Sequence, residues 1–393
     1  MQDNEKKPAL RFKGFTDPWE QRKLGEICDF ITKGATPTTY GFSWQPDGVP
    51  FFRNDSIKDN VFVFGEFSYI SEAANEVLKR SEVHGNDILI AITGDIGKVG
   101  IIPDTVEKAN INQHIARVRI RKEALPYFVY QYLASDDTQK EYQKIKTGLS
   151  MPQLSLEQVR DIVVKIPEFN EQGKIADCLR RIDTLITLHQ RKYEKLVNIK
   201  KSMLDKMFPQ NGASVPEIRF KGFTDPWEQR KLGDLCVEFR SGEFISASDI
   251  TETGEYPVFG GNGLRGFTDR FNHDGEYTLI GRQGALCGNV NFAVGKSYFT
   301  EHAIAVRADK KNQTRFLYYL FSTMDLGQYS GQSAQPGLAV GNLVELKSTL
   351  PDKQEQEKIS GVLTALDTLI TLHQRKLEKL QNIKKSCLEK MFV

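Results

Sequence analysis

The amino-acid sequence contains two copies of its own pattern, and this repetition restricts the fold more than any other feature does. The fifteen residues RFKGFTDPWEQRKLG stand at 11–25 and again at 219–233, and DTLITLHQRK stands at 183–192 and again at 367–376. Between these blocks the two copies diverge. We therefore predict two halves with one architecture in a chain of 393 residues. The identical segments are expected to act twice in the same way, and the divergent segments to perform two different tasks.

The second repeated block lies within a heptad pattern that predicts one long helix in each half. Seam residues recur at alternating steps of four and three residues from Ile175 and again from Ile359, which is typical of a coiled coil. Each helix should run for about 38 residues, or about 57 Å, with Asn170 as the cap of the first. We expect the two seams to bury each other, with His189 and His373 fixing the register rather than binding a metal ion. The seam comprises Ile175, Leu179, Ile182, Ile186, His189, Tyr193, Leu196, Ile359, Leu363, Leu366, Ile370, His373, Leu377 and Leu380.

The basic surplus of the chain lies in these predicted helices. Residues 171–209 hold 9 Lys and Arg against 5 Asp and Glu, and residues 355–393 hold 7 against 5. The divergent segments are slightly acidic, with 16 against 19 over 27–170 and 10 against 12 over 235–350. An antiparallel helix pair would separate two domains by about 50–60 Å. A DNA-binding function would need local basic patches on the acidic domains, because DNA binders are usually basic.

The first repeated block predicts a short helix. Asp17 is a suitable N-cap, Pro18 suits the first helical position, and Glu20 completes a capping box, while Gly25 can end the helix in a left-handed conformation. So short a helix is not stable alone, and its Trp19 must bury its ring. Two interpretations remain open. Either the motif packs between the divergent domain and its neighbour and joins them, or it forms a docking surface for a partner protein. The candidate docking residues are Trp19, Trp227, Arg191 and Arg375.

The divergent segments predict a mixed α/β domain in each half. Short β-like runs precede an aromatic-rich helical stretch at 127–135 in the first half and at 316–323 in the second. The β-like runs lie at 88–92, 115–120, 278–281 and 303–307. His114 and His302 recur beside a strand, where we expect a shared structural hydrogen bond rather than catalysis.

The loops of these domains are rich in Gly, Asn, Arg, Gln and Thr. Arg reads guanine and Asn and Gln read adenine, although ordinary turns use many of the same residues. The DNA-binding candidates are Lys33, Thr36, Thr38, Tyr40, Arg53, Asn54, Lys58, Lys98, Lys146, Ser150 and Gln153 in the first half. Those of the second half are Arg240, Ser241, Asn262, Arg265, Arg270, Arg282, Gln283, Asn289, Gln332 and Gln335.

Motifs for several kinds of catalysis are absent from the sequence. Without a Pro-Pro dipeptide, the chain cannot carry the [DN]-P-P-[YFW] site of methyltransferases that act on amino groups of DNA bases. The GKS at 295–297 lacks the first glycine of a phosphate-binding loop. The five cysteines form no C-x-x-C pair, and the six histidines have no metal-ligand spacing. We therefore expect no catalytic residue, cofactor or metal ion in this chain. The longest apolar runs are only a handful of residues, too short to cross a membrane, and no signal-peptide pattern appears, so we expect a cytoplasmic protein.

The layout and the helix pattern EQ-x-KI…(I/L)D-x-LI…EKL…KKS…KMF resemble those of the specificity subunit of type I restriction-modification systems. GFTDPWEQRKLG is similar to the proximal motif that opens each half in many bacterial members. The resemblance implies two α/β target-recognition domains separated by two long antiparallel coiled-coil helices, with a pseudo-twofold internal repeat. Each domain would read one half of a bipartite, asymmetric site on double-stranded DNA, and the helices would set the spacing.

The same resemblance implies partners that carry the chemistry. Two methyltransferase subunits with S-adenosylmethionine would dock on the repeated regions and methylate adenine. Two motor-nuclease subunits, which use ATP and Mg²⁺, would complete the enzyme. Two rival interpretations remain, a single-chain DNA endonuclease or methyltransferase with a cryptic site, and a coiled-coil protein that bridges other proteins without binding DNA.

The resemblance also suggests boundaries for the parts of the chain. The expected parts are a proximal motif at 1–26, a first recognition domain at 27–169, a central helix at 170–209, a linker with the second proximal motif at 210–234, a second recognition domain at 235–353 and a C-terminal helix at 354–393.

Overall fold

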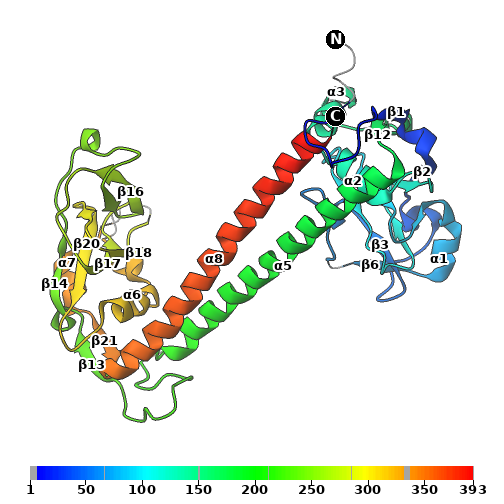
Figure 1. The fold of residues 1–393 in the computed structure, drawn as a ribbon. Coiled ribbons are helices and arrows are strands. Elements are labelled where there is room, and N and C mark those ends of the chain that lie inside the picture. The colour runs from blue at the N-terminus through cyan, green and yellow to red at the C-terminus, as the bar shows by residue number, and fades with distance from the viewer. Residues whose placement is uncertain are drawn as a thin grey trace. The chain divides into compact units, whose positions relative to one another are not determined.

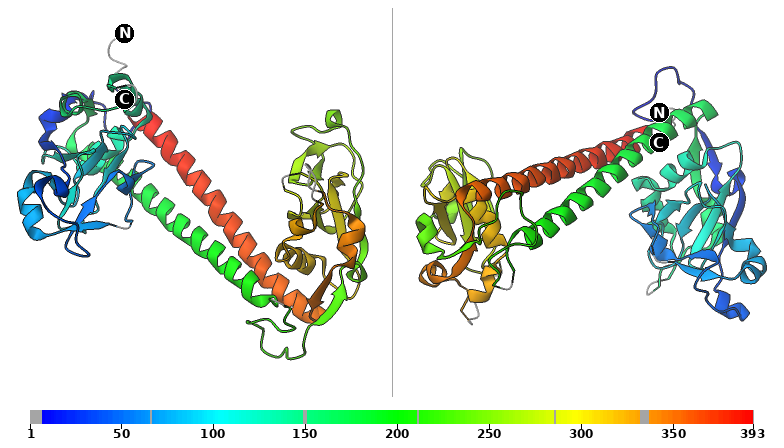
Figure 2. Two further views of the ribbon diagram at one scale, coloured as in Figure 1. Left: turned by 180° about the vertical axis from the view of Figure 1, so that it is seen from behind. Right: turned by 90° about the horizontal axis from the view of Figure 1, so that it is seen from below.

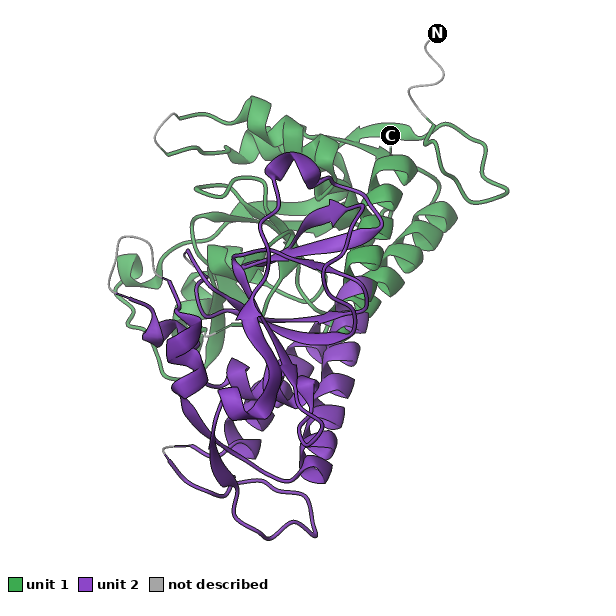
Figure 3. Ribbon diagram, turned by 90° about the vertical axis from the view of Figure 1, so that its left-hand side faces the viewer, with its two compact units in different colours: residues 1–189, 376–393 green, residues 190–375 purple. Residues whose placement is uncertain are grey.

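Two compact units make up the chain. The computed structural model describes residues 7–65, 67–148, 151–210, 212–284, 286–331 and 337–392. Unit 1 comprises residues 1–189 with 376–393, and unit 2 comprises residues 190–375 (Figure 3). Each unit contains one divergent segment, one copy of the repeated motif and a part of both long helices. The duplication of the sequence is therefore a duplication of the fold.

Unit 1 alternates short strands with short helices before the chain enters its first long helix. The strands are β1 (Glu20–Lys23), β2 (Cys28–Lys33), β3 (Val49–Phe52), β4 (Ile57–Lys58), β5 (Val61–Phe62), β6 (Ser68–Ile70), β7 (Glu82–Val83), β8 (Ile88–Ala91), β9 (Val99–Ile101), β10 (Ala109–Ile111), β11 (Ile115–Ile120) and β12 (Val163–Ile166). The α-helices are α1 (Glu72–Val77), α2 (Pro126–Leu133), α3 (Asp136–Ile145), α4 (Leu156–Asp161) and α5 (Phe169–Met207). The 3-10 helices are η2 (Leu24–Ile27), η3 (Pro37–Tyr40), η4 (Asn54–Ser56) and η5 (Lys79–Ser81).

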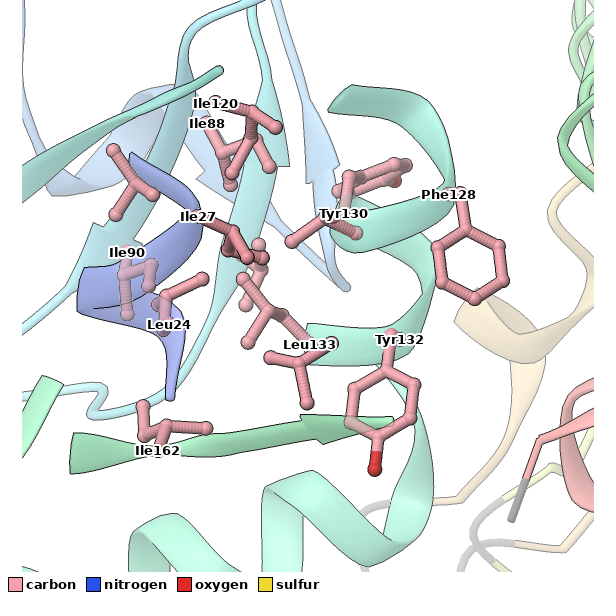
Figure 4. Packing of buried hydrophobic residues seen from close by; sticks show 14 of the residues in the cluster. Leu24, Ile27, Ile88, Ile90, Ile120, Phe128, Tyr130, Tyr132, Leu133 and Ile162 are labelled. Carbon is pink, nitrogen blue, oxygen red and sulfur yellow. The ribbon is translucent and has the colours of Figure 1, made fainter. Parts of the chain in front are cut away.

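The core of unit 1 lies on both faces of a four-stranded sheet in the order β2-β11-β8-β9. Side chains alternate between the faces of a strand, so Ile88 and Ile90 of β8 pack in one cluster with Phe128 of α2 (Figure 4). Leu89 points the other way, toward a second sheet in the order β6-β3-β10-β7. Each residue of β8 is at most 1% exposed, which explains the uninterrupted apolar run ILIA.

Unit 2 has fewer elements than unit 1, but the strands of its main sheet, its aromatic-rich helix and its long helix follow one another in the same chain order. The strands are β13 (Glu228–Lys231), β14 (Cys236–Ser241), β15 (Tyr256–Gly260), β16 (Gly263–Thr268), β17 (Glu276–Gly281), β18 (Val290–Val294), β19 (Tyr298–Phe299), β20 (Ala303–Ala308) and β21 (Lys347–Leu350). The helices are α6 (Thr314–Ser322), α7 (Val340–Glu345), α8 (Lys353–Met391), η6 (Gly233–Leu235), η7 (Ala247–Asp249) and η8 (Leu326–Tyr329).

The sheets of unit 2 correspond to those of unit 1. The order β14-β20-β17-β18 matches β2-β11-β8-β9, and the pair β13-β21 matches β1-β12. The sheet β16-β15-β19 keeps the single parallel pair seen between β3 and β10. Phe316 of α6 packs on Ile280 and Ile304 of the main sheet, as Phe128 does in unit 1. The mixed α/β class predicted for both halves is confirmed.

In each unit a part of α5 lies alongside a part of α8 (Figures 1 and 2). Each helix is 39 residues long. In unit 1, Asp183 of α5 lies 2.7 Å from Lys384 of α8, and in unit 2, Lys200 of α5 lies 2.5 Å from Asp367 of α8. An early residue of each helix therefore meets a late residue of the other, which makes the pair antiparallel as predicted. Every seam residue named above is buried or half-buried, including His189 and His373.

The prediction of a short helix in the repeated motif is wrong. Glu20–Lys23 forms β1, which pairs antiparallel with Val163–Ile166 of β12, and β13 pairs with β21 in the same way. Capping signals are local, whereas strand pairing depends on a partner far along the chain, which a local pattern cannot reveal. Gly25 is not in the left-handed region. A Cβ at Gly25 would lie 3.2 Å from Cβ of Arg160, so close packing explains the glycine.

The prediction that Asn170 caps the first long helix is also wrong. Helix α5 begins at Phe169, and the carbonyl of Glu168 accepts hydrogen bonds from the N–H groups of Glu171 and Gln172. In the second half, Oδ1 of Asp352 accepts a hydrogen bond from the N–H group of Glu355. Glu168 and its counterpart Asp352 therefore accept hydrogen bonds from free N–H donors at the start of each helix.

Candidate nucleic-acid interface

Three loops of unit 1 meet at the end of β8. The carbonyl of Thr93 accepts a hydrogen bond from Nδ2 of Asn54 at 2.8 Å, and Thr93 forms a β-bridge with Gln153. The N–H group of Ile92 donates to the carbonyl of His114 at 2.9 Å. Two DNA-binding candidates from loops a hundred residues apart, Asn54 and Gln153, are thus held around one strand end.

The equivalent strand end in unit 2 has the same backbone arrangement. Gln283, the second residue after the end of β17, forms a β-bridge with Gly337. The N–H group of Arg282 donates to the carbonyl of His302 at 2.8 Å, and the N–H group of Leu338 donates to the carbonyl of Arg282 at 2.8 Å. The shared hydrogen bond predicted at His114 and His302 is therefore made by their backbone carbonyls.

The first loop of each domain joins this cluster through a glycine. A Cβ at Gly34 would lie 1.9 Å from the carbonyl oxygen of Ile111, and one at Gly242 would lie 2.2 Å from that of Phe299. The two glycines permit this close approach. After it, the chain of unit 1 runs from the exposed Lys33 into the loop that holds Thr36, Thr38 and Tyr40, and the chain of unit 2 runs from Ser241 into the equivalent loop. Oγ1 of Thr36 donates to Oε1 of Gln113 at 2.5 Å, beside His114.

Several candidate cations are already paired within the domains. Lys98 lies 2.6 Å from Asp95, and Arg270 lies 3.2 Å from Asp249, both as exposed pairs. Such pairs contribute about 0–1 kcal/mol, so a phosphate group can replace the carboxylate at small cost. The guanidinium of Arg53 stacks 4.8 Å from the ring of Trp44 and donates to Oγ of Ser68, and Lys146 donates to Oε1 of Gln143.

Arg240 is held by a carboxylate with an altered pKa. Burial opposes ionisation of Glu238, yet hydrogen bonds from Arg240 and Tyr277 and the charge of His273 hold its pKa below the ordinary value. The Arg240–Glu238 distance is 2.7 Å. Because Glu238 is largely buried, releasing Arg240 would leave that charge without its main partner. Arg240 is accordingly the weakest of the arginine candidates for contacting DNA.

Other candidates are open to solvent. Lys33, Lys58, Arg265 and Arg282 form no ion pair with any residue that the structure describes, and all but the half-buried Arg282 are exposed. Asn262 and Asn289 are exposed as well. Ser150, Gln332 and Gln335 lie outside the described residues.

Sequence reasoning missed two aromatic residues beside these loops. Trp44 is 37% exposed and lies under Arg53, and Phe244 is 74% exposed in the loop after β14. Exposed aromatic rings stack on bases or insert between them in many nucleic-acid complexes. An aromatic residue within a loop rich in Gly and Ser is a signal that could have been used, but its exposure cannot be read from sequence.

The docking candidates fall into two groups. Trp19 and Trp227 are 2% and 3% exposed and pack on Phe128 and Phe316, so neither ring offers a docking surface and the packing interpretation describes them. Arg191 and Arg375 are exposed at matching places on α5 and α8.

Comparisons with known proteins agree with this architecture. A family model described as the type I restriction modification DNA specificity domain matches residues 16–198 and 224–382. The specificity subunit of the type I restriction enzyme EcoprrI from Escherichia coli is 30% identical over 372 residues, which cover 91% of this chain and 89% of that protein. A putative type I restriction enzyme MjaX specificity subunit from Methanocaldococcus jannaschii is 24% identical over 392 residues, covering 94% and 91%. The crystal structure of an S subunit from M. genitalium shares the fold with a TM-score of 0.74 at 17% identity, covering 98% of this chain and 99% of that one.

The fold and the paired loop clusters define a two-domain DNA-recognition protein. The chain belongs to the family of type I restriction-modification DNA specificity subunits. It is a non-catalytic recognition subunit of such a system, and the two rival interpretations are not favoured. Among the described residues, no three metal-ligating side chains gather in one place, and no helix is both long and apolar enough to cross a membrane.

Proposed function

We propose that each unit reads one half of a bipartite, asymmetric site on double-stranded DNA through the loops around its central strand end. The main support is that equivalent backbone positions carry different side chains in the two units. The bridge between Thr93 and Gln153 in unit 1 is formed by Gln283 and Gly337 in unit 2, and Ile92 of unit 1 stands where unit 2 has Arg282. Amides favour adenine and arginine favours guanine, so the two units would select different bases.

The long helices would set the distance between the two half-sites and dock the partners. Two methyltransferase subunits fit the duplication, because DTLITLHQRK presents the same side chains twice. Leu185 and Leu188 of α5 are 43% and 46% exposed, and their counterparts Leu369 and Leu372 of α8 are 42% and 44% exposed. An apolar surface that recurs at the same positions is what two copies of one partner need. Arg191 and Arg375 extend it.

The chemistry would then reside in those partners. The methyltransferase subunits would carry S-adenosylmethionine and methylate adenine, and two motor-nuclease subunits would supply ATP- and Mg²⁺-dependent cleavage. The complex would act in the cytoplasm, where bacterial DNA is located.

An arginine variant of unit 2 tests whether each unit reads its own half of the DNA site. In a complex assembled with the methyltransferase subunits, Arg265→Ala should relax one half of the methylated sequence and cost about 1–3 kcal/mol of discrimination, as for a lost contact between arginine and a base edge. Sequencing of methylated adenines would measure the effect. Lys347→Ala, which removes an exposed cation from β21, should leave both halves unchanged. Relaxation of both halves together by Arg265→Ala would contradict independent reading.

A further inference from the structure

Packing accounts for only part of the identity between the two copies of RFKGFTDPWEQRKLG. Arg11 donates two hydrogen bonds to the buried Glu171 at 2.7 Å, and Arg219 binds Glu355 in the same way. Trp19 and Leu24 lie in the core of unit 1, as their counterparts do in unit 2. These residues need to be the same because each copy fastens its domain to the first turn of a long helix.

Seven of the fifteen residues are exposed in both copies. They are residues 13, 14, 16–18, 20 and 21, with their counterparts 208 positions later. Asp17, Gln21 and their counterparts make no hydrogen bond or ion pair through their side chains to any described residue. Because no such contact within the described part of either unit explains Asp17, Gln21 and their counterparts, a molecule that contacts both units in the same way is the simplest reason for the identity of these residues.

A cleft lies beside the exposed residues in each unit. In unit 1 its volume is about 500 Å³, and Asp17, Glu20, Arg22 and Glu168 are among the residues that line it. In unit 2 a cleft of about 350 Å³ is lined at matching positions by Asp225, Glu228, Arg230 and Asp352. The charged lining that the two clefts share thus holds three carboxylates and one arginine. The second cleft is also lined by Arg219, Lys311 and Lys353, and Arg219 is paired with Glu355. In unit 1 the arginine is itself paired, because Arg22 lies 3.4 Å from Glu20 and 3.2 Å from Glu26.

The cleft borders a strand edge that is free within the described residues. Strand β1 pairs with β12 alone, and β13 pairs with β21 alone. The N–H group of Leu24 donates to the carbonyl of Ile162. Because hydrogen-bonded and non-hydrogen-bonded residue pairs alternate along two antiparallel strands, this bond determines which residues of β1 are hydrogen-bonded to β12. Gln21 therefore occupies a position that is not hydrogen-bonded to β12 and directs its backbone N–H and C=O groups outward. The bond from Leu232 to Leu346 places Gln229 in the same way.

We propose that each motif binds an extended, basic segment of a methyltransferase subunit, which adds a strand to the outer edge of β1 or β13. This inference rests on the proposed function, in which two such subunits are the partners. An open strand edge supplies backbone hydrogen bonds, and neighbouring side chains supply specificity. The shared carboxylates favour lysine or arginine on the added strand and disfavour DNA, whose phosphates they would repel. Duplicated edges would hold one segment from each methyltransferase subunit.

Charge reversal at Asp17 and Asp225 tests the acidic lining. The double variant Asp17→Lys with Asp225→Lys should bind the methyltransferase subunit about tenfold or more weakly, since like charges would now face each other. Titration of the purified chain with the methyltransferase subunit, followed by calorimetry, would measure this. The control Glu107→Lys with Asp274→Lys makes the same charge change at exposed residues elsewhere and should bind as the wild type does.

Hydrogen exchange tests the strand edge itself. Peptides that contain Gln21 and Gln229 should exchange more slowly when the methyltransferase subunit is bound. Unchanged exchange there, or equal affinity of the Asp17→Lys, Asp225→Lys variant, would overturn the inference. Protection by DNA alone would overturn it as well. If the wild-type chain bound no methyltransferase subunit at all, the proposed function would fail too, so the two failures are distinguishable.

Discussion

Arginine side chains in this protein serve opposite purposes according to their surroundings. Arg11 is 12% exposed at its side chain and forms a bidentate pair with Glu171, whose side chain is fully buried. Arg265 is exposed and forms no ion pair within the described part of the chain. The first arrangement fixes structure, whereas the second leaves a guanidinium free for a base edge or a phosphate. Composition alone could not separate the two.

Removal of Arg11 should destabilise unit 1 strongly. In Arg11→Ala, Glu171 keeps its charge in a buried place without its partner, which costs about 3–5 kcal/mol. Urea unfolding followed by the fluorescence of Trp19 and Trp44 would report the loss. Lys13→Ala, an exposed change in the same motif, should alter stability by about 0.5 kcal/mol or less. Equal midpoints for the two variants would mean that the Arg11–Glu171 pair contributes no net stability.

The lowered pKa of Glu238 gives a pH-dependent prediction. Because its folded-state pKa lies below the ordinary value of 4.5, Glu238 contributes stability above that pH, and the contribution is lost as the pH falls through the lowered pKa. The free energy of unfolding of Glu238→Gln should therefore fall below that of the wild type near pH 7, and the gap should narrow as the pH falls through the lowered pKa of Glu238. A gap that is constant with pH would show that the substitution acts through packing instead. Glu107→Gln, at an exposed site, serves as the control.

At the scale of elements, the local sequence pattern was enough to predict those helices and strands whose structure depends on neighbours in sequence. The heptad seam predicted α5 and α8, and the apolar runs predicted β8, β11, β17 and β20 close to their observed bounds. The motif strand β1 escaped prediction because β12, its partner, is distant in sequence. The sheet β6-β3-β10-β7 escaped it for another reason, because its strands are only two to four residues long and show little periodicity.

Lys200 and Lys384, at equivalent positions of α5 and α8, have partners that the heptad periodicity did not indicate. Asp183 accepts hydrogen bonds from Tyr127 and Gln131 of α2 and pairs with Lys384 of α8, so one carboxylate joins the domain to both long helices. Asp367 does the same in unit 2 for Tyr319 and Lys200. These carboxylates lie in the block DTLITLHQRK, which gives one structural reason for its duplication. The role predicted for His189 and His373 in fixing the register stays a prediction.

Removing Asp183 should therefore loosen the attachment of the first domain. Asp183→Ala leaves Lys384 and the hydroxyl of Tyr127 without their acceptor, at a cost of about 1.5–3 kcal/mol for hydrogen bonds to a charged group. Differential scanning calorimetry of the chain would measure the change. Asp177→Ala alters an exposed carboxylate of the same helix and should have little effect. If both variants melted like the wild type, the pair would not carry the attachment.

At the scale of the whole molecule, duplication was the feature from which most of the function could be predicted. It indicated two equivalent attachment surfaces and two different recognition surfaces before any contact was known. The individual base-reading residues could not be predicted in this way. The same Asn, Gln and Thr side chains make loop hydrogen bonds, as Asn54 does with Thr93 and Thr36 does with Gln113. Only the arrangement of the loops distinguishes the two uses.

The equivalence of the two attachment surfaces can be tested by exchanging domains. Residues 26–162 could replace residues 234–346, because both junctions lie where the halves have the same backbone. Leu24 bonds to Ile162 just before β12, and Leu232 bonds to Leu346 just before β21. The carboxylates that hold the domains, Asp183 and Asp367, are also the same. The exchanged chain should fold, assemble with the methyltransferase subunits, and direct methylation to a site built from two copies of the first half-site.

Sequencing of methylated adenines in cells that express the exchanged chain would give the answer. A control chain with the two domains in each other's places should keep both original half-sites, which separates a failure of the junctions from a failure of recognition. Persistence of the original second half-site in the exchanged chain would show that bases are read outside residues 234–346. In that case the specificity would belong to the helices or the motifs, and their identity in the two halves would then need another explanation.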